Sequence, residues 1–244
     1  MKTLTPEVLE QIRSLGTCVV SNAIEKFKVR PRNEGFTDST IRSMFPSHPP
    51  IIGYAATGRI RSDVFPIADG VPEFLDRTDW WDHVLSVSGP RVVVLQDMDH
   101  HLGMHPRGRG AFWGEVHANI HLRLGCVGAI TNGAVRYVDR IRHSGFQVFA
   151  GSVSVSHGFV HFVDFGGTVQ VGGLSVASGD LLLADQHGVL HIPKEIAKDI
   201  PTVAFEIEKK KRRIIHFCRS SAFSLEELRK LVKEDEPGLT TPQD

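Results

Sequence analysis

The sequence is short of cysteine, of excess charge and of long apolar runs, and each shortage excludes a class of protein. Its 244 residues include three cysteines, Cys18, Cys126 and Cys218, an odd number without metal-site spacing. They indicate reduced thiols in a cytoplasmic protein rather than a disulfide-stabilised scaffold. The 28 Lys and Arg residues are balanced by 28 Asp and Glu residues. Because non-specific binding to nucleic acid or to anionic membranes needs a basic excess, we expect neither.

No apolar run in the sequence approaches the roughly 18 residues of a membrane span. Residues 1–16 also lack the continuous apolar stretch of a secretory signal. What the chain does contain is an ordinary globular composition, 41% hydrophobic and 23% charged, which is typical of a folded protein. Its 13 histidines are the one unusual count, and they suit metal ligands, acid–base groups or plain surface positions.

The N-terminal part of the chain predicts helices followed by loops. Thr5 and Pro6 begin a helix that ends at Gly16, and Thr17 begins a second helix. Residues 28–50 have no regular apolar period and are expected to form loops.

The middle of the chain predicts an α/β fold. Strands are expected at 51–60 and 91–98, on either side of a less regular stretch that contains Trp80 and Trp81. Beyond them the expected elements are a helix at 112–125, a strand at 126–131, a helix at 135–145 and a strand at 146–150. This alternation is typical of parallel strands that are joined by helices.

The last part of the chain predicts strands and then helices. Glycines separate short strands over 151–193, a helical region follows at 194–217 with an interruption at Pro201, and a capping box at Ser224 begins a last helix. We expect one domain over residues 1–236. Its expected parts are a helical N-terminal part at 1–50, an α/β core at 51–193 and C-terminal helices at 194–234, followed by a disordered tail at 237–244.

The strongest local signal for chemistry is segment 128–141, in which a strand runs through a glycine turn into a helix. Such a junction places the N–H groups of a helix start at the carboxyl end of a strand, and Arg136 lies there. Its guanidinium either binds both oxygens of a ligand carboxylate or forms a surface salt bridge with Asp139 or Asp99.

A weaker signal of the same kind is segment 107–119. Glycines at 108, 110 and 114 precede a helix that has Glu115 in its first turn. The segment either cradles an anion on its backbone amides or is an ordinary helix start, where the helix dipole favours a glutamate.

Four segments of the chain form an ordered set of motifs: TCVVSNAI at 17–24, IIGYAATGRI at 51–60, GEVHANIHLRLGCVGAITNGAVRYVDRI at 114–141 and VGGLSVASGDLLLADQHGVLHIP at 171–193. Together these segments resemble the RraA-like family. The family contains divalent-metal-dependent 4-hydroxy-4-methyl-2-oxoglutarate / 4-carboxy-4-hydroxy-2-oxoadipate aldolases, which also decarboxylate oxaloacetate, and protein regulators of ribonuclease E. The resemblance extends over residues 17–215. It implies a layered β/β/α core of the swivelling-domain type with flanking N- and C-terminal helices.

The resemblance also implies roles for particular residues. The family has an acidic residue, twenty intervening residues and then an arginine, and Glu115 and Arg136 keep that spacing. By resemblance, Arg136 binds the carboxylate of a 2-oxo acid or the enolate oxygen, and Glu115 orients a metal-bound water. The implied substrate-binding residues are Gly114, Glu115, Val116, His117 and Arg136.

Mg²⁺ or Mn²⁺ is the cofactor that the resemblance implies, with Glu115 beside it. The family's metal-contacting aspartate, however, is Tyr137 in this chain, and a phenol is a poor ligand for a hard cation. Three further family acids are replaced, by Asn22, Asn132 and His187. The chain therefore has either a weakened family metal site, a different metal site or no metal.

Histidines supply the alternatives to the family's metal site. One alternative is a softer ion held by His100, His101 and His105 of the loop 97–106. His117 and His121, one helical turn apart, form either a second chelating pair or a packed or solvated helix face. Without a metal, His117 or a histidine of the loop 97–106 is a candidate general acid–base, and Tyr137 is a candidate donor to the oxyanion.

The candidate catalytic residues are therefore Arg136, Glu115, His117 and Tyr137. The leading hypothesis is a lyase that acts on a small 2-oxo acid through a pyruvyl enolate, by retro-aldol cleavage or by decarboxylation. The alternatives are enolisation without cleavage, as in a tautomerase or hydratase, and a non-catalytic regulator that binds a protein partner. The resemblance further implies a homotrimer or hexamer with sites between subunits, in which Glu206 or Glu208 reaches a neighbouring subunit's site.

Overall fold

The computed structural model describes residues 3–68, 71–72, 77–101 and 110–235. Within these ranges the chain forms a nine-stranded sheet in the order β1-β8-β7-β5-β2-β12-β13, with β6 paired to β7 and β9 paired to β2. Its strands are β1 (Arg42–Ser43), β2 (Ile51–Arg61), β5 (Arg91–Asp97), β6 (Ala111–Trp113), β7 (Cys126–Val135), β8 (Gln147–Val153), β9 (His161–Phe165), β12 (Leu181–Asp185) and β13 (Gly188–Ile192). Two small hairpins are β3 (Ile67–Ala68) with β4 (Val71–Pro72), and β10 (Val169–Val171) with β11 (Leu174–Val176).

The centre of the sheet is parallel, as the alternating pattern predicts: β2 pairs with β5, β5 with β7 and β7 with β8, all in parallel. These strands are buried on both faces, which explains their nearly continuous apolar sequences. In β5, Val93 and Leu95 belong to the core that the helices cover, whereas Val92 and Val94 belong to a second core under the β10–β11 hairpin. The hairpin therefore covers the face opposite the helices.

The helices are α1 (Pro6–Phe27), α2 (Arg77–Ser86), α3 (Glu115–Arg123), α4 (Val138–Ser144), α5 (Ile200–Cys218) and α6 (Leu225–Asp235), with a short 3-10 helix η1 (Met98–His101). The predicted helix boundary at Gly16 is confirmed as a break inside α1, where φ is 75° and ψ is 165°. The N–H and the hydroxyl of Thr17 each donate to the Asp185 carboxylate at 2.8 Å. Burial raises the pKa of Asp185, but hydrogen bonds from Thr17 and His187 outweigh burial and leave it below its usual value.

The structure differs from the predicted elements at several places. Strand β7 continues to Val135, so the predicted glycine turn is part of the strand, and α4 begins at Val138 instead of 135. The short strand β1 lies within the stretch 28–50 that the sequence predicts as loops, and α5 begins at Ile200 instead of 194. The stretch around Trp80 is the helix α2, and the Trp80 ring packs against Phe162 with 4.9 Å between ring centroids. Helix α3 begins at Glu115 rather than at 112, because the residues before it form β6 beside β7. Pro201 does not interrupt α5 but lies in its first turn, where a missing N–H costs no helix hydrogen bond.

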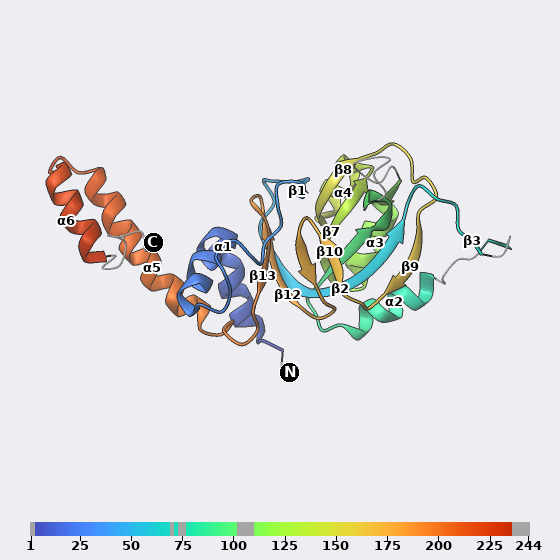
Figure 1. Cartoon of the computed structure of the whole chain (residues 1–244), viewed down its shortest axis with the longest axis horizontal. Helices are drawn as coiled ribbons and strands as arrows, with labels where there is room; N and C mark the ends of the chain where they lie inside the picture. The colour runs from blue at the N-terminus through green and yellow to red at the C-terminus, as the bar shows by residue number, and fades with distance from the viewer. Residues whose placement is uncertain (1–2, 69–70, 73–76, 102–109, 236–244) are drawn as a thin grey trace.

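The flanking helices lie at one end of the layered sheet. Figure 1 shows α1 and the start of α5 beyond the β12–β13 edge, with the rest of α5 and α6 extending away from the sheet. The predicted cap of α6 is confirmed, since the Glu227 N–H donates to the Ser224 hydroxyl at 3.2 Å. The expected α/β fold, a layered sheet with flanking N- and C-terminal helices, is thereby confirmed.

Two predictions about the ends of the chain stay predictions. The tail at 237–244 lies outside the described residues, and nothing tests the boundary of a single domain at 236. In the part of the chain that the structure describes, no helix combines the length and the apolar character needed to cross a bilayer.

Candidate active site

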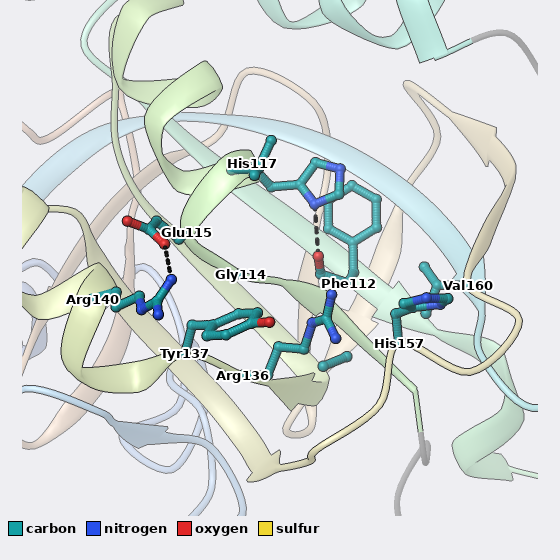
Figure 2. A pocket seen from close by; sticks show the side chains of 11 residues that line it. Phe112, Gly114, Glu115, His117, Arg136, Tyr137, Arg140, His157 and Val160 are labelled. Atoms are coloured by element: carbon teal, nitrogen blue, oxygen red, sulfur yellow. Dashed lines mark hydrogen bonds and ion pairs between the residues drawn. The ribbon is translucent and has the colours of Figure 1, made fainter.

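Two strand-to-helix junctions lie next to each other and border a cavity of about 420 Å³ (Figure 2). The strand β6 leads through Gly114 into α3, and its partner β7 leads through Arg136 and Tyr137 into α4. The Arg136 N–H donates to the Trp113 carbonyl at 2.9 Å, which holds the two junctions together. The cavity is lined by Ala111, Phe112, Gly114, Glu115, Val116, His117, Arg136, Tyr137, Arg140, His157 and Val160.

The cavity brings together all six residues that the sequence suggested for substrate binding and catalysis: Gly114, Glu115, Val116, His117, Arg136 and Tyr137. Sequence reasoning missed Ala111, Phe112, Arg140, His157 and Val160. Arg140 had a usable signal, because it follows Arg136 by four residues, about one helical turn. His157 had none, because it lies between β8 and β9, and only the tertiary structure brings that connection to the cavity.

The start of α3 presents backbone donors to the cavity. Gly114 is the N-cap residue in an extended conformation, and no side chain caps the helix. The first N–H groups of a helix have no carbonyl partner within the helix, and the helix dipole adds partial positive charge there. The N–H groups of Glu115 and Val116 belong to this turn, so this edge of the cavity favours an anion.

An ion pair between α3 and α4 joins the two junctions. The Glu115 carboxylate pairs with Arg140, with 3.0 Å between Oε2 and Nη1, and not with Arg136. Among the described residues Arg136 forms no ion pair with Asp139 or Asp99, and the Asp99 carboxylate lies 3.9 Å from Arg61 Nε instead. The predicted salt-bridge alternative for Arg136, to Asp139 or Asp99, is therefore not formed.

Tyr137 has an unusual backbone conformation for an aromatic residue. Its φ of 55° and ψ of 40° are left-handed, a region that glycine, asparagine and aspartate tolerate best. The Arg136 Cζ lies 4.9 Å and the Arg140 Cζ 5.1 Å from the centre of the Tyr137 ring. In Figure 2 the Arg140–Glu115 pair lies toward one edge of this ring and Arg136 toward the other.

Two histidines line the cavity, and each has its Nδ1 against a backbone carbonyl. His117 Nδ1 is 2.9 Å from the Phe112 oxygen, and His157 Nδ1 is 2.8 Å from the Gly158 oxygen. A carbonyl only accepts, so each Nδ1 carries the hydrogen, and Nε2 is the acceptor in the neutral ring. The His117 ring also stacks on the Phe112 ring with 4.5 Å between centroids, which fixes its orientation.

His121 is excluded as a metal ligand beside His117. It is fully buried, its Nδ1 lies 2.7 Å from the His117 carbonyl, and the Trp80 indole N–H donates to its Nε2 at 3.0 Å. Both nitrogens are therefore occupied. Burial is the main cause that lowers the pKa of His121 to about 4, so the ring stays neutral. Of the two alternatives for this helix face, the packed one is confirmed for His121.

The remaining predicted positions lie away from the cavity or outside the described residues. His105 and the side chains of His100 and His101 are not described, so a histidine metal site there stays a prediction. Of the four positions at which family acids are replaced, only Tyr137 lines the cavity. Glu206 and Glu208 lie on α5, and each lines a hollow between α1 and α5 that is separate from the cavity. Their role in a neighbouring subunit's site also stays a prediction.

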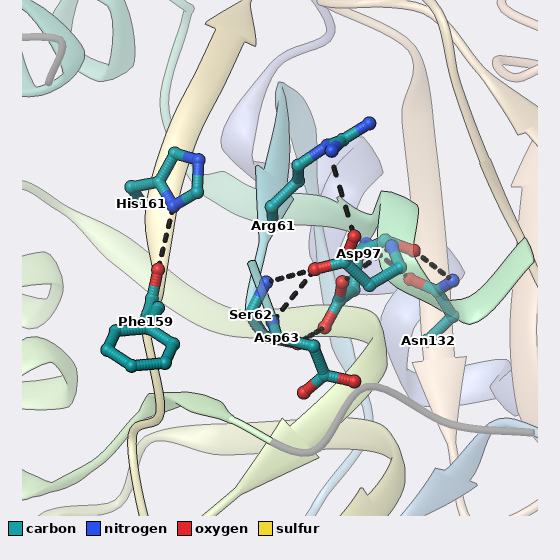
Figure 3. A network of polar contacts seen from close by, with 8 residues as sticks. Arg61, Ser62, Asp63, Asp97, Asn132, Phe159 and His161 are labelled. Atoms are coloured by element: carbon teal, nitrogen blue, oxygen red, sulfur yellow. Dashed lines mark hydrogen bonds and ion pairs between the residues drawn. The ribbon is translucent and has the colours of Figure 1, made fainter. Parts of the chain in front are cut away.

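A buried polar network holds the carboxyl ends of β2, β5 and β7, the last of which leads to Arg136 (Figure 3). The Asp97 carboxylate accepts the Ser62 hydroxyl at 2.6 Å and the Asp99 N–H at 3.1 Å. Asn132 bonds the Asp97 backbone twice, accepting its N–H at 2.7 Å and donating to its carbonyl at 3.0 Å. Burial is the largest cause that raises the pKa of Asp97 to about 6, with smaller contributions from nearby acids.

The cavity residues do not fit the hard divalent cation that the resemblance implies. Mg²⁺ and Mn²⁺ need several oxygen ligands, usually carboxylates. Among the described lining residues there is one carboxylate, Glu115, which is already paired with Arg140, and two guanidinium groups lie around Tyr137. Across the described residues, no three His, Cys, Asp or Glu side chains are grouped as a metal site.

Comparison with known proteins identifies the family of this chain. A family model described as RraA-like, Aldolase/RraA, matches residues 17–191, well over half of the chain. The chain belongs to the RraA-like family. The matched range includes both junctions and every residue that lines the cavity.

Two solved structures share the RraA-like fold at low sequence identity. An uncharacterized protein from Pseudomonas syringae has a TM-score of 0.69 and 20% identity, over 94% of this chain and 95% of that one. Streptomyces coelicolor RraAS2, an unusual member of the RNase ES inhibitor RraA protein family, has a TM-score of 0.66 and 17% identity, over 87% and 97%. Protein DlpA of Legionella pneumophila is 27% identical over 129 residues, 52% of this chain and 21% of DlpA. The chain thus spans about a fifth of that curated relative.

Proposed function

We propose that this RraA-like protein is a lyase that acts on a small 2-oxo acid through a pyruvyl enolate, by retro-aldol cleavage of a 4-hydroxy-2-oxo acid or by decarboxylation of an oxaloacetate-like substrate. The family includes lyases and regulators. The observation that carries the lyase proposal is the convergence, in one cavity, of Arg136, the first turn of α3 and two oriented histidines.

Each group has a chemical task in this proposal. Arg136 binds the substrate carboxylate with both arms of its guanidinium, and the N–H groups of Glu115 and Val116 bind the pyruvyl oxygens. In retro-aldol cleavage, the Nε2 of His117 removes the proton from the 4-hydroxyl group, the bond between C3 and C4 breaks, and C4 leaves as a carbonyl compound. In decarboxylation the same bond breaks as C4 leaves as CO₂. In both cases the electron pair of the bond forms the enolate, and a proton added to C3, from the histidine in retro-aldol cleavage, gives pyruvate.

Tyr137 completes the proposed site as a hydrogen-bond donor. The negative charge develops on the C2 oxygen, and a phenol beside two guanidinium groups is suited to stabilise it. Before the substrate binds, Glu115 holds Arg140 at the edge of the ring. A homotrimer or hexamer, with a neighbour's Glu206 or Glu208 near the cavity, belongs to the same proposal.

The test is pyruvate release from a panel of 4-hydroxy-2-oxo acids and oxaloacetate, with EDTA, Mg²⁺ or Mn²⁺ and with enzyme-free controls for spontaneous decarboxylation. Arg136→Lys keeps the charge but loses the paired geometry. We expect it to lower kcat/KM at least ~10-fold, about the 1.4 kcal/mol of one charged hydrogen bond. Unchanged kinetics in a folded Arg136→Lys protein would remove Arg136 from the site.

Enolisation without cleavage is the nearest alternative, and it has its own readout. Exchange of the pyruvate methyl hydrogens for deuterium, followed by NMR, reports enolate formation even when no carbon–carbon bond is broken. Exchange without cleavage of any panel compound would favour a tautomerase or hydratase. Absence of both activities in folded protein would contradict the enzyme proposal.

A regulator that binds a protein partner is the second candidate. It is favoured by the replacement of the family's metal-contacting aspartate by Tyr137 and by the exposure of Val116, 70%, and of Tyr137, 48%, at the cavity. Stoichiometric binding to a ribonuclease E-type partner, lost on Val116→Glu, together with no activity on the panel would establish it.

A further inference from the structure

The Tyr137 backbone is the first sign that its ring has a defined task. A left-handed conformation is unfavourable for a non-glycine residue and persists where surrounding contacts determine it. The Tyr137 carbonyl accepts the Ile141 N–H at 3.0 Å, which starts α4, and its ring contacts two guanidinium groups. The contacts of the Tyr137 ring with two guanidinium groups therefore help to hold its backbone in a conformation that suits aspartate better than tyrosine.

The charge of the cavity is the second sign. Among the described residues, its lining holds two arginines and one glutamate, so 2 − 1 leaves one net positive charge with the histidines left out of the count. A divalent cation would add repulsion to this charge, whereas an anion would neutralise it. The surface pair of Glu115 and Arg140 is 44% and 64% exposed at the two side chains, and a pair this exposed is readily replaced.

We propose that the Arg136–Tyr137–Arg140 group takes the place of the family's divalent cation, and that Glu115 is the internal counter-ion that an acidic group of the ligand displaces from Arg140. The ligand is a 2-oxo carboxylate or its enolate. It is bound without metal, through Arg136, the Tyr137 hydroxyl and the freed Arg140. This inference rests on the proposed function only in the choice of ligand, because its readout is binding and not turnover.

The experiment uses oxalate, a planar dianion that mimics the enolate of pyruvate, titrated calorimetrically into the full chain in excess EDTA. The wild-type protein is expected to bind oxalate, and Mg²⁺ titrated into protein from which EDTA has been removed is expected to give no binding heat. Arg140→Gln is expected to weaken oxalate binding at least ~10-fold through one lost charge-assisted contact. Arg123→Gln is the matched control, because Arg123 is exposed on α3 and does not line the cavity. It should leave binding unchanged.

Two further variants separate the roles of Tyr137 and Glu115. Glu115→Gln removes the competing carboxylate, so oxalate should bind more tightly than to wild type. Tyr137→Asp suits the left-handed backbone and restores the family's acid, so it should lose oxalate binding in EDTA and gain a requirement for Mg²⁺. Thermal unfolding of each variant shows whether it is folded.

Several outcomes would overturn this inference. They are no oxalate binding to wild type in EDTA, tight binding of Mg²⁺ to wild type, equal binding by Arg140→Gln and wild type, or weaker binding by folded Glu115→Gln. Failure of the proposed function looks different. Metal-free oxalate binding without turnover leaves this inference standing and removes the lyase, whereas turnover that requires Mg²⁺ keeps the lyase and removes this inference.

Discussion

Replacement of Asp97 by asparagine is expected to remove a pH-dependent cost from folding. Asp97 is fully buried at the end of β5, and burial is the main cause that raises its pKa from 3.8 to about 6. A folded-state pKa above the unfolded one means that the folded state binds the proton more tightly. This contribution is therefore most favourable below about pH 4, and it is lost as the pH rises through about 6.

The magnitude follows from the pKa shift. A rise from 3.8 to about 6 corresponds to about 3 kcal/mol at neutral pH, at about 1.4 kcal/mol per pKa unit. About 2 kcal/mol of this cost develops between pH ~4.5 and pH ~7.5, because the unfolded state has already lost most of its proton at the lower pH and the first ~1 kcal/mol develops below it. The asparagine side chain of the variant has no carboxylate to titrate. The stability of Asp97→Asn relative to wild type should therefore rise by that amount between the two pH values.

The assay is urea unfolding of both proteins at the two pH values and one protein concentration. Asp82→Asn is the matched control, because Asp82 is exposed on α2. It should show no such difference between the pH values. The new amide of Asp97→Asn meets the Ser62 hydroxyl and the Asp99 N–H, so the absolute stability of the variant also reflects changed hydrogen bonds. Only the pH dependence tests the reasoning, and a difference between Asp97→Asn and wild type that is equal at both pH values would refute it.

Three further predictions concern packing, the buried histidine and assembly. Gly151→Ala should lower the free energy of unfolding by about 3 kcal/mol in urea, because the new Cβ would lie 2.3 Å from the Asn132 carbonyl oxygen. Gly167→Ala is the control and should be nearly neutral, because its new Cβ meets nothing within 4 Å. Trp80→Phe should lower the free energy of unfolding by about 1–3 kcal/mol or more in the same assay, because it leaves the buried His121 Nε2 without its donor. A smaller loss would show that another donor replaces the indole N–H. Light scattering should give a mass near a multiple of three times 27.0 kDa, and a monomer at micromolar concentration would contradict sites between subunits.

Local patterns predicted the elements well where one short segment carries the signal. The break at Gly16 and the cap at Ser224 depend on residues within a few positions of each other, and both are confirmed. The prediction failed around Trp80, because a helix that packs aromatic side chains against β9 has no clear local period. It also failed at the start of α3, because β6 forms only by pairing with β7.

The sequence by itself determined the family, the α/β class and the six residues at the two junctions, because the family motifs, the strand–helix order and the spacing of Glu115 and Arg136 are local features of the chain. Only the tertiary structure decided which partner each side chain has. It pairs Glu115 with Arg140, places His157 in the cavity and hides His121 under Trp80. Charge balance and burial depend on segments that meet in space but are separated in sequence, and local spacing does not encode those meetings.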